Sequence, residues 1–100
     1  MFLSNQLQKD AMNLSERLAQ HGITERKDDT LMIPFENRSG FVQVRVQAGR
    51  VWMRDLLAEG RPALGEFGKW RSQSLELVSW VLQRDTLLAE WLRSRGASVK

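Results

Sequence analysis

The chain has 100 residues, of which 42% are hydrophobic and 27% charged, as is typical of one globular domain. It has no Cys and a single His, which excludes disulfides, thiolate zinc sites and thiol nucleophiles. The pI near 10 reflects a net charge of only +3 in a chain without Cys or Tyr, so it indicates no particular partner.

Targeting signals are not apparent at the start of the chain. The segment MFLSNQLQKD has no basic n-region and no long apolar core, so it does not resemble a signal peptide. No apolar run approaches the roughly 18 residues of a membrane span. With the absence of Cys, these features predict a cytoplasmic protein that does not enter membranes.

The first expected element is a helix over residues 3–21. Its apolar residues recur at three-to-four spacing and form one stripe: Leu3, Leu7, Ala11, Leu14 and Leu18. Gly22 should end the helix and let Ile23 fold back on Leu18. A polar connector over residues 24–29 follows.

Three strands are expected next, over residues 31–36, 41–47 and 50–55. Ala48 and Gly49 fit a two-residue hairpin loop, which places Val44 opposite Met53. A four-residue loop over residues 37–40 places Ile33 opposite Val44. Both loops put the apolar side chains on one face, which favours an antiparallel meander.

The rest of the chain predicts a connector and a long helix. Residues 56–68 are rich in Gly and read as a linker, and residues 69–95 carry a wide apolar arc of helical periodicity. Trp70 is expected at the centre of this arc. Trp80, Leu87 and Trp91 form one shoulder of it, and Gly96 ends the helix.

These elements predict the α+β class. We expect a two-layer sandwich of α-β-β-β-α order, in which a three-stranded antiparallel meander is covered on one face by an N-terminal and a long C-terminal helix. Residues 1–96 would form a single domain, and residues 97–100 a frayed tail.

Two surfaces are candidates for binding. The first is the outer face of the sheet, where Arg45 should lie opposite Trp52 and Gln43 opposite Arg54. Its candidate residues, suited to nucleic acid or to an acidic protein partner, are Gln43, Arg45, Arg50, Trp52 and Arg54. The alternative interpretation is an ordinary solvated face, in which the arginine stems cover the indole.

The second surface is the helix shoulder of Trp80, Leu87 and Trp91. A small sheet does not necessarily cover so wide an arc, and exposed tryptophans favour a dimer or a partner interface. The alternative is that the first helix covers these residues from the side, which would make them part of the core.

Catalytic chemistry is sparse. One His and no Cys leave no nucleophile–base pair, and the carboxylates are scattered among turns and helix faces. The sequence therefore predicts no enzyme, no metal site, no cofactor and no small-molecule substrate.

The order of elements is similar to that of the double-stranded RNA-binding domain. That family carries a basic cluster at the start of its last helix and contacts RNA from there. The corresponding stretch here, GEFGKWRSQS, contains only Lys69 and Arg71 as basic residues. The resemblance is limited to element order, and no family is assigned.

The leading hypothesis is a small non-enzymatic protein-interaction module, such as an adaptor, an inhibitor or a chaperone-like accessory factor. It would act as a homodimer or on another protein through the Trp-bearing C-terminal helix. The alternative hypothesis is a nucleic-acid-binding protein that uses the outer face of the sheet.

Overall fold

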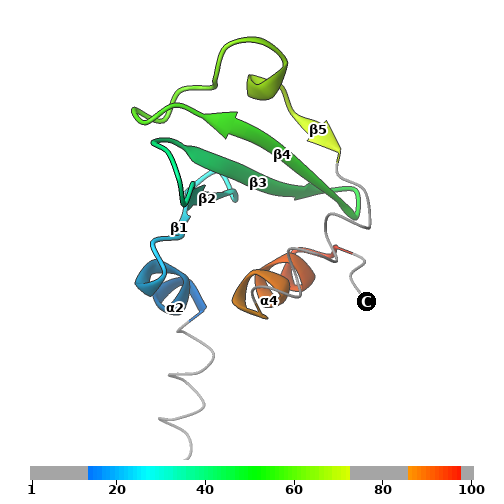
Figure 1. Cartoon of the computed structure of the whole chain (residues 1–100). Coiled ribbons are helices and arrows are strands. Elements are labelled where there is room, and N and C mark those ends of the chain that lie inside the picture. Colours follow the sequence, from blue (N-terminus) through cyan, green and yellow to red (C-terminus); the bar gives the residue numbers. More distant parts are fainter. Residues whose placement is uncertain (1–13, 73–85, 98–100) are drawn as a thin grey trace, which may run out of the picture.

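A computed structural model describes residues 14–72 and 86–97. In these ranges an antiparallel sheet of five strands, ordered β1-β2-β3-β4-β5, carries two α-helices on one face (Figure 1). The elements in chain order are α2 (Leu14–Gln20), β1 (Thr24–Glu25), β2 (Leu31–Pro34), β3 (Phe41–Gln47), β4 (Arg50–Leu56), the 3-10 helix η1 (Gly65–Gly68), β5 (Arg71–Ser72) and α4 (Thr86–Ser94). The α+β class is confirmed.

The β3–β4 hairpin has the register that the alternation predicts. Val44 pairs with Met53 and Arg45 with Trp52 across the two strands. The loop between them is Ala48–Gly49, and both residues have positive φ, 54° and 73°. Such a turn matches the twist of the flanking strands, so it fixes the register of the hairpin.

The β2–β3 register differs from the prediction by two residues. Ile33 pairs with Val42 instead of Val44, and Pro34 pairs with Phe41, so the loop runs over residues 35–40. Gly40 has φ 103°, and a Cβ there would lie 2.5 Å from the carbonyl oxygen of Leu56. The chain therefore turns at Gly40, close to the end of β4. A shift of two residues keeps every side chain on its expected face.

The sheet has two strands more than the three expected. β1 pairs with β2, and β5 pairs with β4 through Trp52↔Ser72 and Met53↔Arg71. The prediction that the last helix begins at Lys69 is therefore wrong, because Arg71 and Ser72 are extended. Residues 73–85, which hold the middle of the expected helix, lie outside the described residues, as does the first part of the expected N-terminal helix.

The core lies between the helices and one face of the sheet. Figure 1 shows α2 and α4 on the same side of the strands. The buried cluster comprises Leu18, Ile23, Leu31, Val44, Val51, Leu87, Leu88, Trp91, Leu92 and Ala97. Ala97 was expected in the tail, but its backbone N donates to the Leu92 carbonyl at 3.0 Å and its side chain is buried. Ile23 makes the same bond to Leu18 at 2.9 Å, so both helices end in the same way.

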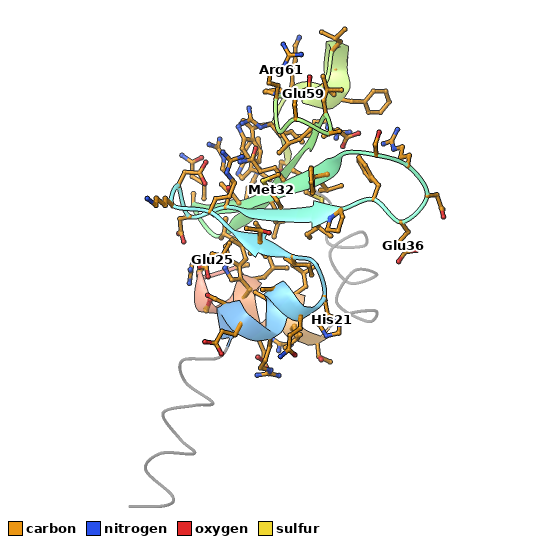
Figure 2. All side chains as sticks on the ribbon, turned by 90° about the vertical axis from the view of Figure 1, so that its left-hand side faces the viewer. His21, Glu25, Met32, Glu36, Glu59 and Arg61 are labelled. Atoms are coloured by element: carbon orange, nitrogen blue, oxygen red, sulfur yellow. The ribbon has the colours of Figure 1, made fainter. Side chains whose placement is uncertain are left out.

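Glu25 joins both helices to the edge of the sheet. Its carboxylate accepts hydrogen bonds from Ser15 of α2, from Trp91 Nε1 of α4 at 3.3 Å, and from Arg95. Figure 2 shows Glu25 between the strands and the helices. The bond from Ser15, with smaller contributions from Trp91 and Arg95, lowers the pKa of Glu25, and burial opposes this only in part. The charged carboxylate therefore stabilises the packing of the two layers.

Candidate functional site

The sheet face turned away from the helices gathers most of the candidate residues. Alternation along β3 and β4 puts their arginines on the side opposite Val44 and Val51. Met32 lies on the same outer side (Figure 2). We call this surface the Arg/Trp face, and its residues are Arg26, Gln43, Arg45, Arg50, Trp52, Arg54 and Trp70.

A chain of hydrogen bonds runs across the Arg/Trp face. Arg54 Nε donates to Gln43 Oε1 at 2.7 Å, and Gln43 Nε2 donates to Thr30 Oγ1 at 2.9 Å. Thr30 Oγ1 in turn donates to Asp28 Oδ1 at 2.6 Å. The bond to Gln43 holds the guanidinium of Arg54 in one orientation, and its remaining N–H groups are available to donate to other acceptors.

Gln43 has a different role from the one predicted. It was expected to be exposed as part of a binding patch, but its exposed fraction is 1%. The side chain lies beneath the face and links Arg54 to Thr30. Gln43 therefore positions Arg54, and a ligand on the surface would not touch it.

Trp70 belongs to the face, although the sequence placed it on a helix. Continuing the β4–β5 register by one residue beyond Met53↔Arg71 puts Trp70 opposite Arg54. The guanidinium carbons of Arg45 and Arg54 lie 4.3 Å and 4.5 Å from the centre of its ring. Each such cation–π contact is worth about 0.5–1 kcal/mol at an exposed site. The strand β5 has only two residues, too few to show an alternating pattern, so it could not be predicted from the sequence.

Positive charge on this face exceeds negative charge. Burial is the largest cause that lowers the pKa of Arg54, and the charges of Arg45 and Arg26 lower it further. Asp28 is the carboxylate that opposes this effect. Arg26 is itself anchored by a contact of 3.4 Å from Nη1 to the sulfur of Met32. Around Arg54, the positive charges of Arg45 and Arg26 therefore outweigh the carboxylate of Asp28, an arrangement that would favour an anion at this surface.

Two hydrogen-bond donors on the face have no acceptor among the described residues. These are Nε of Arg45 and Nε1 of Trp52, both of them buried atoms. A buried donor without an acceptor costs about 1–3 kcal/mol. Departures of this kind from ordinary packing are expected at functional sites, where side chains are not chosen for stability alone.

Arg50 extends the face towards the β3–β4 turn. It pairs with Gln47 at the end of the hairpin and is exposed. Alternation places it on the same side as Trp52 and Arg54. Its charge is therefore available to a ligand that covers the face along β4.

The helix shoulder is not arranged as the leading hypothesis expected. Trp91 is 0% exposed and Leu87 is 8% exposed, and both pack in the core. Trp80 lies outside the described residues. Within the described part of α4, the shoulder therefore contributes to the core, as the alternative interpretation held.

Within residues 14–72 and 86–97, no three side chains of His, Cys, Asp or Glu come together as metal ligands would. No helix in this part of the chain has the length and apolar character needed to cross a membrane.

Comparison of the chain with protein-family models, with curated proteins and with solved structures found no match.

Proposed function

We propose that this protein is a non-enzymatic binding module that holds single-stranded nucleic acid on the Arg/Trp face. The observation that carries the proposal is the grouping of Arg45 and Arg54 around Trp70, with the charge of Arg26 acting on Arg54 and Asp28 as the opposing carboxylate. This excess of cations is local, so it does not depend on the modest net charge of the chain.

The chemistry of the face suits a phosphate backbone with unpaired bases. Guanidinium groups bind phosphate oxygens through two parallel hydrogen bonds, and Arg54 is already oriented for this by Gln43. Trp52 and Trp70 provide indole rings beside these cations, and stacking of a base on an aromatic ring is worth about 1–3 kcal/mol. An acidic protein segment would use the cations but not the rings.

A protein partner or a second copy of the chain on the C-terminal helix is the competing proposal. Its described shoulder residues, Leu87 and Trp91, are buried within the chain, so they offer no contact area without a rearrangement of the core. The nucleic-acid proposal needs no such rearrangement. A homodimer and a cytoplasmic location stay predictions of the sequence.

The proposal is tested by fluorescence anisotropy of a dye-labelled deoxythymidine oligomer, titrated with the protein at several salt concentrations. Log affinity should fall linearly with log salt, by about 0.7 for each phosphate contact to a single strand. Arg45→Glu and Arg50→Glu should each weaken binding and reduce the slope. Arg93→Glu, at an exposed arginine of α4, is the matched control and should bind as the wild type does.

Two further ligands separate nucleic acid from other anions. A duplex of the same length should bind more weakly, because its bases are not accessible to the indoles. Poly-glutamate should compete poorly. If poly-glutamate bound as tightly as the oligonucleotide, the ligand of this face would be an acidic protein and not nucleic acid. The proposal would be refuted if the oligonucleotide did not bind at low salt. It would also be refuted if Arg93→Glu lost as much affinity as Arg45→Glu and Arg50→Glu.

A further inference from the structure

A second candidate site lies on the long connection between β4 and β5, which Figure 1 shows on the side of the sheet away from the helices. A pocket of about 160 Å³ opens there. Its lining includes Phe35, Arg38, Asp55, Ala63, Leu64 and Phe67. Figure 2 shows Glu59 and Arg61 on the same connection.

The connection is a closed and well-bonded loop. Leu57 N donates to the Arg61 carbonyl at 2.7 Å, and Ala63 N donates to the Asp55 carbonyl at 3.0 Å. A Cβ at Gly68 would lie 1.8 Å from the carbonyl oxygen of Ala63, so the two segments touch where the loop closes. The side chains on this loop are therefore held by a fixed backbone.

Two large apolar side chains of this loop lie in solvent. Leu64 is 88% exposed and Phe67 is 61% exposed, and both border the pocket. An isolated exposed apolar residue is ordinary, but two at the rim of a hollow on a fixed loop resemble the apolar centre of an interface.

Arg38 provides a cation at the rim. Its side chain is 64% exposed and meets Asp55 through one contact of 3.3 Å. Its guanidinium carbon lies 4.0 Å from the centre of the Phe35 ring, which holds the group beside the pocket. Arg71 contacts the other oxygen of Asp55, also at 3.3 Å. The carboxylate is thus shared, and Arg38 can still donate to an external carboxylate.

The volume of the pocket limits its occupant. Cavities that hold drug-sized ligands or cofactors have about 300–1,000 Å³, whereas a cavity of about 150 Å³ holds one benzene-sized group. The pocket therefore has room for one bulky apolar side chain, and the cation at its rim would complement a carboxylate next to that side chain.

We propose that this pocket binds an extended segment of a partner protein in which a bulky apolar residue is flanked by acidic residues. The apolar side chain enters the pocket between Phe35 and Phe67, and a neighbouring carboxylate pairs with Arg38. The residues that line the pocket are not among those of the Arg/Trp face, so variants at the pocket test this proposal independently of nucleic-acid binding.

The test is a titration of the ¹⁵N-labelled full chain, followed by NMR, with the peptide GSDFEDGS. Saturable shifts are expected at residues around the pocket, with a Kd on the order of 1 mM or tighter. The peptides GSDAEDGS, without the ring, and GSKFKKGS, with reversed charge, should bind at least about tenfold more weakly. Phe67→Ser and Arg38→Glu should cause a similar loss, whereas Arg93→Glu should not.

Three results would overturn the proposal. One is the absence of saturable shifts at the pocket in the folded wild type. Another is equal binding of the alanine or lysine peptides, which would show that neither ring nor charge is recognised. The third is a dimer in light scattering that Leu64→Ser converts to a monomer, since the occupant would then be a second copy of the chain. Amide spectra of each variant establish that it is folded.

Discussion

The two faces of the sheet are built from the same strands and differ in almost every other respect. The inner face is apolar and covered by two helices, and its carboxylate, Glu25, is bonded to both of them. The outer face has guanidiniums grouped around the Trp70 indole, a buried amide at Gln43 and buried donors that find no acceptor in the part of the chain that the structure describes. The inner face is thus arranged for stability, while the outer face has features that stability alone does not explain.

The largest expected effect separates the tryptophans of the two faces. Trp91→Ala should cost about 3–5 kcal/mol of unfolding free energy, because the side chain is 0% exposed and fills the core. Trp52→Ala should cost about 1–2 kcal/mol, since this residue is only partly buried. Urea unfolding measures both values, and an equal cost would contradict the distinction between the faces.

A smaller effect is expected at the centre of the outer face. Gln43→Ala should cost about 1–3 kcal/mol, because Thr30 and Arg54 each lose a buried partner. It should also weaken oligonucleotide binding, because Arg54 is no longer held in place. Gln47→Ala, at an exposed glutamine of the same strand, should change stability by less than about 0.5 kcal/mol. If Gln43→Ala bound the oligonucleotide with unchanged affinity, Gln43 would have no role in positioning Arg54.

On the inner face, Glu25→Gln should reduce stability by about 1 kcal/mol at neutral pH, a value kept small because the carboxylate is partly exposed and screened. The pKa of Glu25 is lowered on folding, so its contribution is complete above the unfolded pKa of about 4.3. It is lost as pH falls through the folded pKa, so the difference between wild type and variant should shrink towards zero at pH values below that folded pKa.

The control for this prediction is Glu66→Gln, at a carboxylate whose side chain is 84% exposed and pairs with Lys69 on the surface. Chemical denaturation across the pH range should give nearly parallel curves for Glu66→Gln and the wild type. A difference between Glu25→Gln and the wild type that persists or grows in acid would mean that the lowered pKa has no part in stability.

The smallest effect is expected at the turn that joins the two central strands. Ala48 has φ 54°, in the left-handed region that disfavours a Cβ. Ala48→Gly should therefore stabilise the hairpin by about 0.5–1 kcal/mol, and affinity for oligonucleotide should not change. Thermal unfolding measures the gain, and a lower melting temperature would contradict the turn geometry.

The central hairpin could be predicted because the alternation of apolar residues and the two-residue turn both indicate the same pairing of β3 with β4. The β2–β3 register could not be predicted, because it depends on the close approach of Gly40 to Leu56, two residues that lie far apart in the sequence. β1 and β5 were missed because strands of two residues have no period to detect. For the same reason Trp70 was assigned to a helix, and Arg26 was not included in the binding patch.

The C-terminal helix shows a second limit of prediction from sequence, which concerns the burial of a helix face. Periodicity identified Leu87 and Trp91 as one shoulder of a helix, but it could not say what covers that shoulder. In the structure the cover is the same core that α2 and the sheet share, and the indole also donates to Glu25 of β1. Burial of a helix face depends on the placement of other elements, which no local pattern contains.

The most direct test follows the indole N–H signals in ¹⁵N NMR spectra while an unlabelled deoxythymidine oligomer is added. Assignment uses single Trp→Phe variants of the chain, which has four tryptophans. If the Arg/Trp face binds the oligomer, the signals of Trp52 and Trp70 shift with saturation and the signal of Trp91 stays in place. Movement of Trp91 without movement of Trp52 and Trp70 would contradict the proposal, as would the absence of any shift at low salt.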